Sequence, residues 1–268
     1  MRFLHTADWQ IGMKAAHAGE AAARVREARM EAAARVVETA IEEAAEFILI
    51  AGDLFESNGI ARVWVQRIAD LLASAGRPVY IIPGNHDALE PGSVWEHAAW
   101  GGAANAHVLR EASRLEIAGG HLYPCPLRSN RGNADPTAWI PPEHTGAIRI
   151  GLAHGTLGGL ALEENYHPIP PGAADRAGLD FLDLGHWHST RVDGRMAYCG
   201  THETTRFGER DSGNALMVEI DGPGAAPRAW PVRTGVLEWA QFQETIHTAE
   251  GLAVLADRIA RLPDAGRK

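Results

Sequence analysis

Five polar clusters in this sequence each come at the end of a run of apolar residues. They are Asp8-Trp9-Gln10, Gly52-Asp53, Gly84-Asn85-His86-Asp87, His154-Gly155 and Gly185-His186-Trp187-His188. Their carboxylate oxygens, amide oxygens and imidazole nitrogens form a mixed ligand set that suits Mn²⁺, Fe or Zn²⁺ at a catalytic site. This many ligands could hold two cations that share one carboxylate. Such a pair suits the hydrolysis of phosphate esters, which then requires no cysteine or serine nucleophile.

The apolar runs that precede the clusters are predicted to be strands, at residues 2–6, 47–50, 79–82, 148–153 and 181–184. Two predicted helices, at residues 21–45 and 62–74, separate the first three strands. This alternation is typical of parallel strands joined by crossover helices. Ligands of such sheets gather beyond the carboxyl ends of the strands, so we expect an α/β fold whose polar clusters meet at one edge.

The other segments have weaker patterns. Short strand-like runs occur at 107–109, 115–117 and 121–123, and a polar Gly/Pro-rich stretch at 128–142 predicts a surface loop. Three further runs, at 195–199, 215–220 and 228–232, predict a closing antiparallel region. A last helix is predicted at 249–262.

Composition limits the classes of function. The 268 residues are 46% hydrophobic and 22% charged, as in a globular protein, and carry a net charge of −9. This charge argues against a generally basic surface for nucleic acid, so such contacts must be local or helped by cations. Cys125 and Cys199 indicate neither a disulfide framework nor a thiolate metal site. No signal-peptide region or membrane-length apolar run is present, so we expect a soluble, cytoplasmic protein with no membrane partner.

In this order, the clusters resemble the signature of the calcineurin-like metallophosphoesterase superfamily. Three segments more narrowly resemble the DNA double-strand-break repair nucleases, a group that includes the SbcD subunit of the bacterial SbcCD complex: His5-Thr6-Ala7-Asp8-Trp9, Ala51-Gly52-Asp53-Leu54-Phe55-Glu56-Ser57 and Gly200-Thr201-His202-Glu203. The resemblance implies a four-layer sandwich of two mixed sheets flanked by helices. It also implies a catalytic domain at 1–233. Residues 234–268 would begin a capping and linker region that continues beyond this sequence.

The resemblance assigns two cations, with Mn²⁺ expected and Fe or Zn²⁺ as alternatives. The first cation would be held by Asp8, Gln10, Asp53 and His188. The second would be held by Asp53, Asn85, His154 and His186, so that Asp53 bridges the two. His86 would lie near the scissile phosphate, as general acid or as a stabiliser of developing charge, and Asp87 would orient His86.

Gln10 departs from the family pattern, in which the first motif usually ends in His. A neutral amide oxygen is a poorer ligand than imidazole for a borderline metal. We therefore expect activity that persists but requires more Mn²⁺. The alternative interpretation of Gln10 is a purely structural amide.

The function implied by the resemblance is a Mn²⁺-dependent nuclease in double-strand-break repair, with 3′→5′ exonuclease and single-strand endonuclease action. It further implies DNA, an SbcC-like coiled-coil ATPase and a second copy of the chain as partners. The sequence has no G-x-x-x-x-G-K-[ST] motif, so ATP dependence would come from another subunit. The alternatives are a phosphodiesterase or phosphatase for small esters, and a DNA-end-binding scaffold weakened in catalysis.

Candidate DNA contacts are basic residues in or beside predicted loops, namely Lys14, Arg62, Arg128, Arg131, Arg206 and Arg210. Four other arginines, Arg24, Arg26, Arg29 and Arg35, fall among glutamates of the first predicted helix and are expected on a solvated face. His5 and His202 are expected to pack inside the fold.

Overall fold

The apolar runs of the sequence form the strands of two six-stranded sheets. The computed structural model describes residues 1–143, 145–159, 166–241 and 243–262. The strand order of the first sheet is β12 (Arg228–Arg233), β11 (Asn214–Glu219), β1 (Arg2–Thr6), β2 (Phe47–Ala51), β3 (Val79–Ile82) and β4 (Ala106–Val108). The order of the second sheet is β5 (Leu115–Ile117), β6 (Gly120–Cys125), β7 (Ile148–His154), β8 (Phe181–Gly185), β10 (Met196–Tyr198) and β9 (Arg191–Asp193).

The strands that precede the polar clusters run parallel within each sheet. β1 pairs with β2 and β2 with β3 in the first sheet, while β7 pairs with β8 in the second. The helix α1 (Ala22–Glu42) connects β1 to β2, and α2 (Arg62–Ala73) connects β2 to β3. Parallel neighbours need such crossovers, and they bring the carboxyl ends of successive strands to the same edge.

Side chains of both sheets fill the layer between them. Phe3 of β1 stacks on Phe47 of β2 with ring centroids 5.1 Å apart, and it meets Phe181 of β8 edge-on at 6.3 Å. Leu49 and Ile150 belong to the same fully buried cluster. Burial of each such side chain is worth roughly 1.5–3 kcal/mol, so this layer fixes one sheet against the other.

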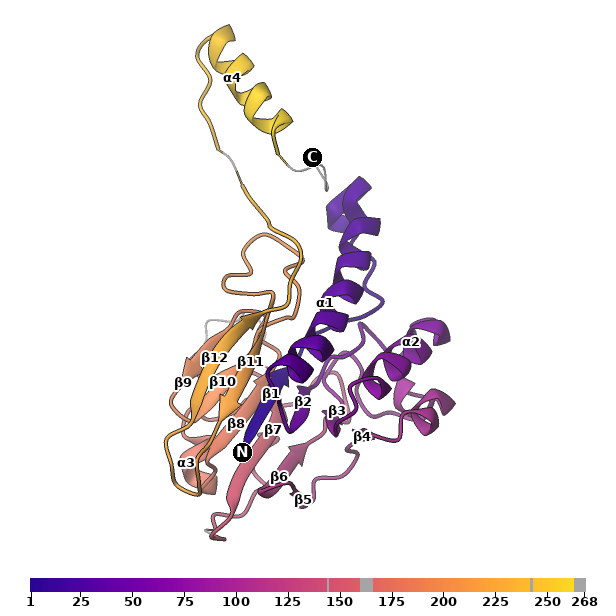
Figure 1. Ribbon diagram of the computed structural model, residues 1–268, viewed down its shortest axis with the longest axis vertical. Coiled ribbons are helices and arrows are strands. Elements are labelled where there is room, and N and C mark those ends of the chain that lie inside the picture. Colours follow the sequence, from indigo (N-terminus) through magenta and orange to yellow (C-terminus); the bar gives the residue numbers. More distant parts are fainter. Residues whose placement is uncertain (144, 160–165, 242, 263–268) are drawn as a thin grey trace.

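Helices cover the outer faces of the sandwich (Figure 1). Val36 of α1 and Ile68 of α2 pack in one cluster with Ile50 of β2. On the second sheet, Ala177 of α3 (Ala173–Ala177) packs in a cluster with Leu182 of β8. Short 3₁₀ helices lie at Ala16–Ala21, Val94–Glu96 and Ala98–Gly102. The layers are thus helix, sheet, sheet and helix, which confirms the expected α/β four-layer sandwich.

The closing part of the fold differs from the expected antiparallel region. β11 pairs antiparallel with β1, and β12 pairs antiparallel with β11, at the edge of the first sheet. β10 instead joins the second sheet parallel to β8. The three runs are therefore divided between the sheets. Neither α3 nor β9 was predicted, because five and three residues are too few to show a period.

The last helix, α4 (Ala249–Ala260), lies apart from the sandwich in Figure 1, and none of its residues is buried. Thr248 caps its start by accepting a hydrogen bond from the N–H of Gly251 at 3.1 Å. Residues 242 and 263–268 of the expected C-terminal region 234–268 lie outside the described residues. Among the described helices, none has both the length and the apolar character needed to cross a bilayer.

Candidate metal centre

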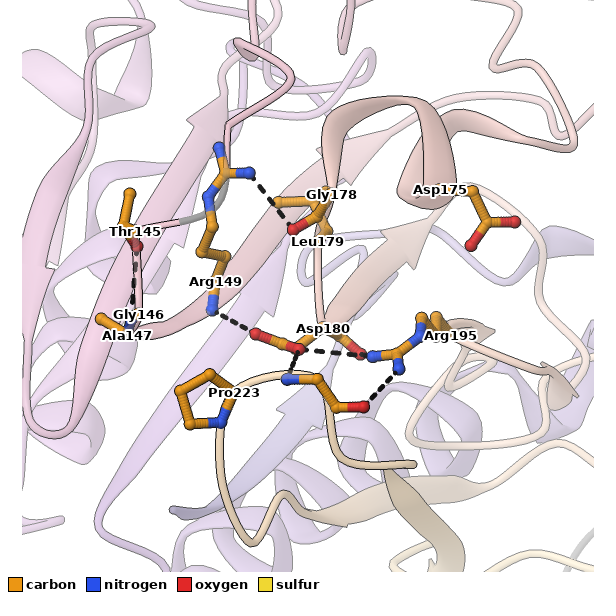
Figure 2. Close-up of a pocket in the computed structure, with 11 residues that line it drawn as sticks. Thr145, Gly146, Ala147, Arg149, Asp175, Gly178, Leu179, Asp180, Arg195 and Pro223 are labelled. Atoms are coloured by element: carbon orange, nitrogen blue, oxygen red, sulfur yellow. Dashed lines mark hydrogen bonds and ion pairs between the residues drawn. The ribbon is translucent and has the colours of Figure 1, made fainter.

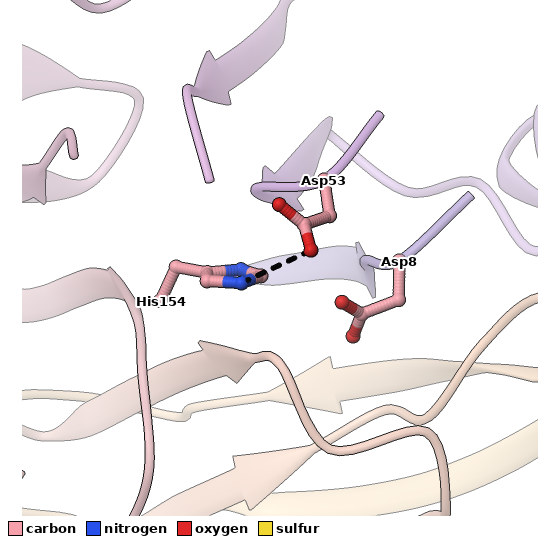
Figure 3. Close-up of side chains that lie close together, drawn as sticks. All are labelled: Asp8, Asp53 and His154. Atoms are coloured by element: carbon pink, nitrogen blue, oxygen red, sulfur yellow. Dashed lines mark ion pairs between the residues drawn. The ribbon is translucent and has the colours of Figure 1, made fainter. Parts of the chain in front are cut away.

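The polar clusters meet where the carboxyl-end edges of the two sheets come together, at a place that we call the rim. Asp8, Asp53 and Asn85 follow β1, β2 and β3, while His154 ends β7 and His186 follows β8. One ligand atom of each of Asp8, Asp53 and His154 lies within 4.8 Å of those of the other two. Figure 3 shows the two carboxylates and the imidazole ring converging on this point from separate strands.

Asn85 lies between two imidazole rings of the rim. Its Oδ1 atom is 2.9 Å from Nε2 of His154 and 3.0 Å from Nδ1 of His186. The same Nε2 atom of His154 is 3.4 Å from Oδ2 of Asp53. The backbone N–H of His186 donates to both carboxylate oxygens of Asp8, at 3.0 and 3.1 Å. The rim therefore joins side chains of both sheets in one polar cluster.

The backbone of the rim is strained. Asp8, Gln10, Asp53 and His186 have φ values of 55°, 41°, 51° and 106°, which L residues rarely adopt. Such conformations cost roughly 1–3 kcal/mol each and persist only where the surrounding structure holds them. Here the N–H of Gln10 donates to the carbonyl of Asp53 at 2.8 Å, which ties the first two clusters together.

Gly84 allows the third cluster to lie directly on Asp53. A Cβ atom at position 84 would be 2.1 Å from Oδ1 of Asp53 and 2.4 Å from its backbone nitrogen. No side chain fits in that space. With glycine there, the backbone N–H of His86 reaches Oδ1 of Asp53 at 2.9 Å.

The surroundings of His86 and Asp87 differ from the expected arrangement. The Nδ1 atom of His86 is 3.0 Å from the carbonyl oxygen of Glu56. The carboxylate of Asp87 instead accepts hydrogen bonds from the backbone N–H groups of Gly84 and Phe55, at 2.7 and 3.0 Å. Asp87 is fully buried, so its role in the structure is to hold the turn that carries Asn85 and His86.

The other two expected ligands lie in the loops beside the rim. Gln10 is 7% exposed and is tied to Asp53 through its backbone. His188 follows His186 in the loop after β8, and its Nδ1 atom is 2.9 Å from Oε1 of Glu209. Glu209 had no signal in the sequence, because it stands in a polar loop far from the five clusters.

The electrostatics of the rim are those of buried carboxylates beside imidazoles. Burial raises the pKa of Asp8. Burial would also raise the pKa of Asp53, but the charge and hydrogen bond of His154 hold it well below its usual range. Burial disfavours the His154 imidazolium, yet the two carboxylates outweigh this and raise its pKa to about 9. Burial and the charge of His154 lower the pKa of His186 to about 3.

The rim residues fit a divalent metal ion. Carboxylate oxygen and imidazole nitrogen suit borderline metals, and Asp8, Asp53 and His154 present one such atom each within bonding reach of a common point. His154 is further defined because its Nδ1 atom lies 2.8 Å from the carbonyl oxygen of Ala51. A carbonyl can only accept, so Nδ1 carries a proton and Nε2 is the atom that can bind a metal.

Arg29 corrects the expected solvated face of the first helix. Its side chain is 1% exposed and points inward, where Nε donates to the carbonyl of Trp9 at 2.8 Å and Nη2 to that of Asp8 at 3.0 Å. Burial lowers its pKa to about 10, so it stays charged at neutral pH. The burial of Arg29 could have been predicted from its spacing. It is four residues after Val25 and three before Ala32, and both of these lie on the buried face of the helix.

Structural roles are confirmed for the two histidines expected to pack. His202 is fully buried and stacks on Trp9, with ring centroids 5.1 Å apart. His5 is fully buried between the sheets, with Nδ1 3.1 Å from Oδ1 of Asp183.

The six candidate DNA contacts are all exposed: Lys14, Arg62, Arg128, Arg131, Arg206 and Arg210. Arg128 and Arg131 lie in a loop that contacts the rim through Asn130. Asn130, between Arg128 and Arg131, donates to the carbonyl of Asn85 at 3.0 Å. Arg206 pairs with Glu209, and Arg128 pairs with Glu111, so part of their charge is already compensated.

Comparison with known proteins identifies the family of the chain. Residues 1–190 match the sequence pattern of the family described as calcineurin-like phosphoesterase. The chain is 29% identical over 211 residues to YhaO, an uncharacterized metallophosphoesterase of Bacillus subtilis (strain 168). This match covers 72% of the chain and 50% of YhaO, so the chain spans about half the length of that relative.

A solved structure shares the fold. The protein TT1561 of Thermus thermophilus superposes with a TM-score of 0.54 at 13% sequence identity, over 87% of this chain and 98% of that one. At this identity the likeness concerns the fold alone.

Proposed function

The chain belongs to the calcineurin-like phosphoesterase family, whose members are metal-dependent phosphoester hydrolases, and from this premise we propose that it is a Mn²⁺-dependent nuclease that hydrolyses phosphodiester bonds of DNA. The proposal includes 3′→5′ exonuclease and single-strand endonuclease action in double-strand-break repair. The motifs that resemble the repair nucleases support it. The three segments that carry the resemblance include the loops of Asp8 and Asp53 and the turn at Gly200.

The observation that carries this proposal is the placement of arginines beside the rim. The loop with Arg128 and Arg131 is tied to Asn85 through Asn130. Arg206 and Arg210 flank Glu209, which contacts His188. A protein with a net charge of −9 can bind a polyanion only through such local positive charge, so basic residues next to the site favour a substrate with several phosphates.

The proposed ligands are those named from the sequence. Asp8, Gln10, Asp53 and His188 would hold the first cation. Asp53, Asn85, His154 and His186 would hold the second. When bound, such cations supply Lewis acidity, which neutralises phosphate charge and acidifies a water molecule. His154 would hold a cation through the lone pair of Nε2, because its Nδ1 proton faces the carbonyl of Ala51.

His86 is proposed as the residue that stabilises or protonates the leaving oxygen. Its side chain is 37% exposed, and Nε2 lies 4.0 Å from Oδ2 of Asp53. Burial disfavours its charged form, but the negative charge of Asp53 and the Glu56 carbonyl raise its pKa. The raised pKa favours the imidazolium, in which Nδ1 donates to the carbonyl of Glu56 and Nε2 carries the proton that could be given to the leaving oxygen.

Partners are proposed on the same basis. DNA is the proposed substrate. An SbcC-like coiled-coil ATPase would supply ATP dependence, because this sequence has no ATP-binding motif. A second copy of the chain would form a homodimer. Light scattering of the chain alone and with such an ATPase tests both associations.

A Mn²⁺ titration of DNA cleavage tests the activity. Wild-type protein is expected to degrade linear duplex and single-stranded DNA, and His86→Ala is expected to lose roughly 10²–10⁴-fold in rate. Gln10→His is expected to reach half-maximal rate at lower Mn²⁺. If wild type and Gln10→His showed the same Mn²⁺ dependence, Gln10 would not limit metal binding. No cleavage of any DNA at saturating Mn²⁺ would overturn the nuclease proposal.

The second candidate is a phosphodiesterase or phosphatase for small esters, which the acidic net charge favours. Comparing kcat/KM for oligonucleotides with that for small phosphodiesters separates the two. Equal values for a dinucleotide and a 20-nucleotide strand would favour the small-ester activity. A strong gain with length would favour the nuclease.

A further inference from the structure

The side chain of Glu209 lies against His188 at the edge of the rim. Oε1 of Glu209 is 2.9 Å from Nδ1 of His188, and the side chains are 3% and 19% exposed. The sequence places Glu209 in the loop between β10 and β11, so only the fold brings it to the loop that follows β8.

The other contacts of Glu209 show that it is a held carboxylate and not a mobile surface acid. Oε2 accepts hydrogen bonds from the backbone N–H groups of Thr205 at 2.8 Å and of Arg206 at 3.3 Å. The hydroxyl of Thr205 lies 3.3 Å from both carboxylate oxygens. Both oxygens thus face donors, which is the pattern of an ionised carboxylate whose position the loop fixes.

The contact determines which nitrogen of His188 carries a proton. A carboxylate that only accepts requires a proton on Nδ1, and the lone pair is then on Nε2. His154 is oriented in the same way, but by the neutral carbonyl of Ala51 at 2.8 Å from its Nδ1. The partner of His188 is an anion, and hydrogen bonds to an ionised group are the stronger class. His188 is therefore held by a charged acceptor, whereas His154 is held by a neutral one.

We propose that Glu209 is a positioning residue that fixes His188 as an Nε2 ligand of the first cation site and strengthens it where Gln10 supplies only a neutral amide. The inference rests on the proposed function, because that assigns His188 to the metal. Glu209 touches neither substrate nor metal in this assignment, and it acts through the imidazole ring.

The test is equilibrium binding of Mn²⁺ to the full chain, measured by calorimetry and by the electron paramagnetic resonance signal of free Mn²⁺. Glu209→Gln keeps the shape and one acceptor oxygen but removes the charge. It is expected to weaken one of two binding steps by roughly 10–100-fold and to leave the other unchanged. The rate of DNA cleavage at saturating Mn²⁺ is expected to recover.

Glu203→Gln is the matched control. Glu203 is a buried carboxylate six residues earlier in the same loop, and it accepts from the backbone N–H groups of Val236 at 2.7 Å and Leu237 at 3.3 Å. Its loss disturbs the loop without touching His188. We expect lower thermal stability and unchanged Mn²⁺ binding. Equal weakening by both variants would overturn the inference, because loop structure alone would then explain it.

A double-mutant cycle with His188→Ala tests whether Glu209 acts through the imidazole ring. In a His188→Ala background, removing the Glu209 charge is expected to have no further effect on Mn²⁺ binding. A full additional effect would overturn the inference. A wild-type chain that binds two Mn²⁺ but cleaves no DNA refutes the proposed nuclease and leaves Glu209 to be decided by the binding data. A chain that binds no Mn²⁺ refutes the role of Glu209.

Discussion

The two ends of the second sheet use charged residues in opposite ways. At the amino ends of β7, β8 and β10, a pocket of about 230 Å³ is lined by Arg149, Asp180 and Arg195 (Figure 2). Arg149 is 1% exposed and donates to carbonyl oxygens that include Pro141 at 2.9 Å and Gly178 at 3.2 Å. Asp180 accepts from backbone N–H groups and pairs with Arg195, so the charges of Arg149, Asp180 and Arg195 all have partners within the protein.

The rim at the carboxyl ends is different. One ligand atom of each of Asp8, Asp53 and His154 lies within 4.8 Å of those of the other two, and four rim residues have a strained backbone. At the amino ends, Arg149, Asp180 and Arg195 form hydrogen bonds and ion pairs within the protein, and these stabilise the fold. Charges at the rim are concentrated at a cost in stability, which is the arrangement expected where a protein binds and reacts. Substitutions at the two ends should therefore separate activity from stability.

The largest effect is expected for Asp8→Asn at the rim. Asparagine tolerates the φ of 55° and can still accept from the N–H of His186, but it removes a proposed ligand charge. Activity should fall roughly 1000-fold, the upper end for loss of one charge-stabilising group. The metal-free stability, measured by denaturant unfolding with chelator present, should not fall, because a buried carboxylate beside Asp53 is removed.

The matched control at the other end is Asp180→Asn. Asp180 accepts from the N–H groups of Arg149 at 2.9 Å and Gly224 at 2.7 Å and pairs with Arg195. Stability should fall by about 1–2 kcal/mol with activity retained. If Asp8→Asn destabilised the protein more than Asp180→Asn, the contrast between the two ends would be wrong.

Arg149→Met should have the next largest effect. Methionine replaces only the aliphatic part of the arginine side chain and leaves several buried carbonyl groups without a donor. The free energy of unfolding should fall by about 3 kcal/mol. The rate of hydrolysis at a temperature where the variant remains folded should match wild type, and a decrease in kcat with unchanged stability would show that the two ends are coupled.

The buried pair between the sheets is sensitive to pH in a way that Asp183→Asn should reveal. Burial lowers the pKa of His5 to about 3 and raises that of Asp183 well above its usual range. Between pH 4.5 and 6 the unfolded chain has a protonated His and an ionised Asp, while the folded pair also holds one proton. The pair therefore adds little pH dependence to stability.

In Asp183→Asn only His5 remains. Its folded pKa lies below the unfolded value, so stability present at pH 7 is lost as the pH falls from about 6.5 toward 3, by up to about 1.4 kcal/mol per pH unit. Unfolding curves at several pH values should show this extra slope relative to wild type. Parallel curves for both proteins would mean that His5 is not held neutral.

The smallest effect is expected for Arg131→Ala beside the rim. The guanidinium lies 5.2 Å from the ring centroid of Tyr166 and is exposed. KM for DNA should rise only a few-fold, and the slope of log K against log salt should fall by about 1. Arg114, which pairs with Glu143 near Arg149, is the control. An equal effect of Arg114→Ala would indicate that DNA is attracted by the charge of the protein in general and does not bind preferentially at the rim.

The sequence by itself determined the local elements and the chemistry at their ends. Alternating apolar runs and Ala-rich amphipathic segments are local patterns, so β1, α1, β2, α2 and β3 could be predicted within a few residues. The polar residues that follow these strands could be placed at a common edge, since parallel strands have their carboxyl ends together. The types of those residues indicated a metal-dependent hydrolase before any geometry was known.

Only the tertiary structure decided how distant segments support the rim. The division of β10 and β11 between two sheets, the inward direction of Arg29 and the contact of Glu209 with His188 depend on packing between elements far apart in the chain. Local propensity has no information on such contacts. In sequence, Glu209 looks like any solvated charge, because its partners are backbone atoms and side chains that the fold alone brings near.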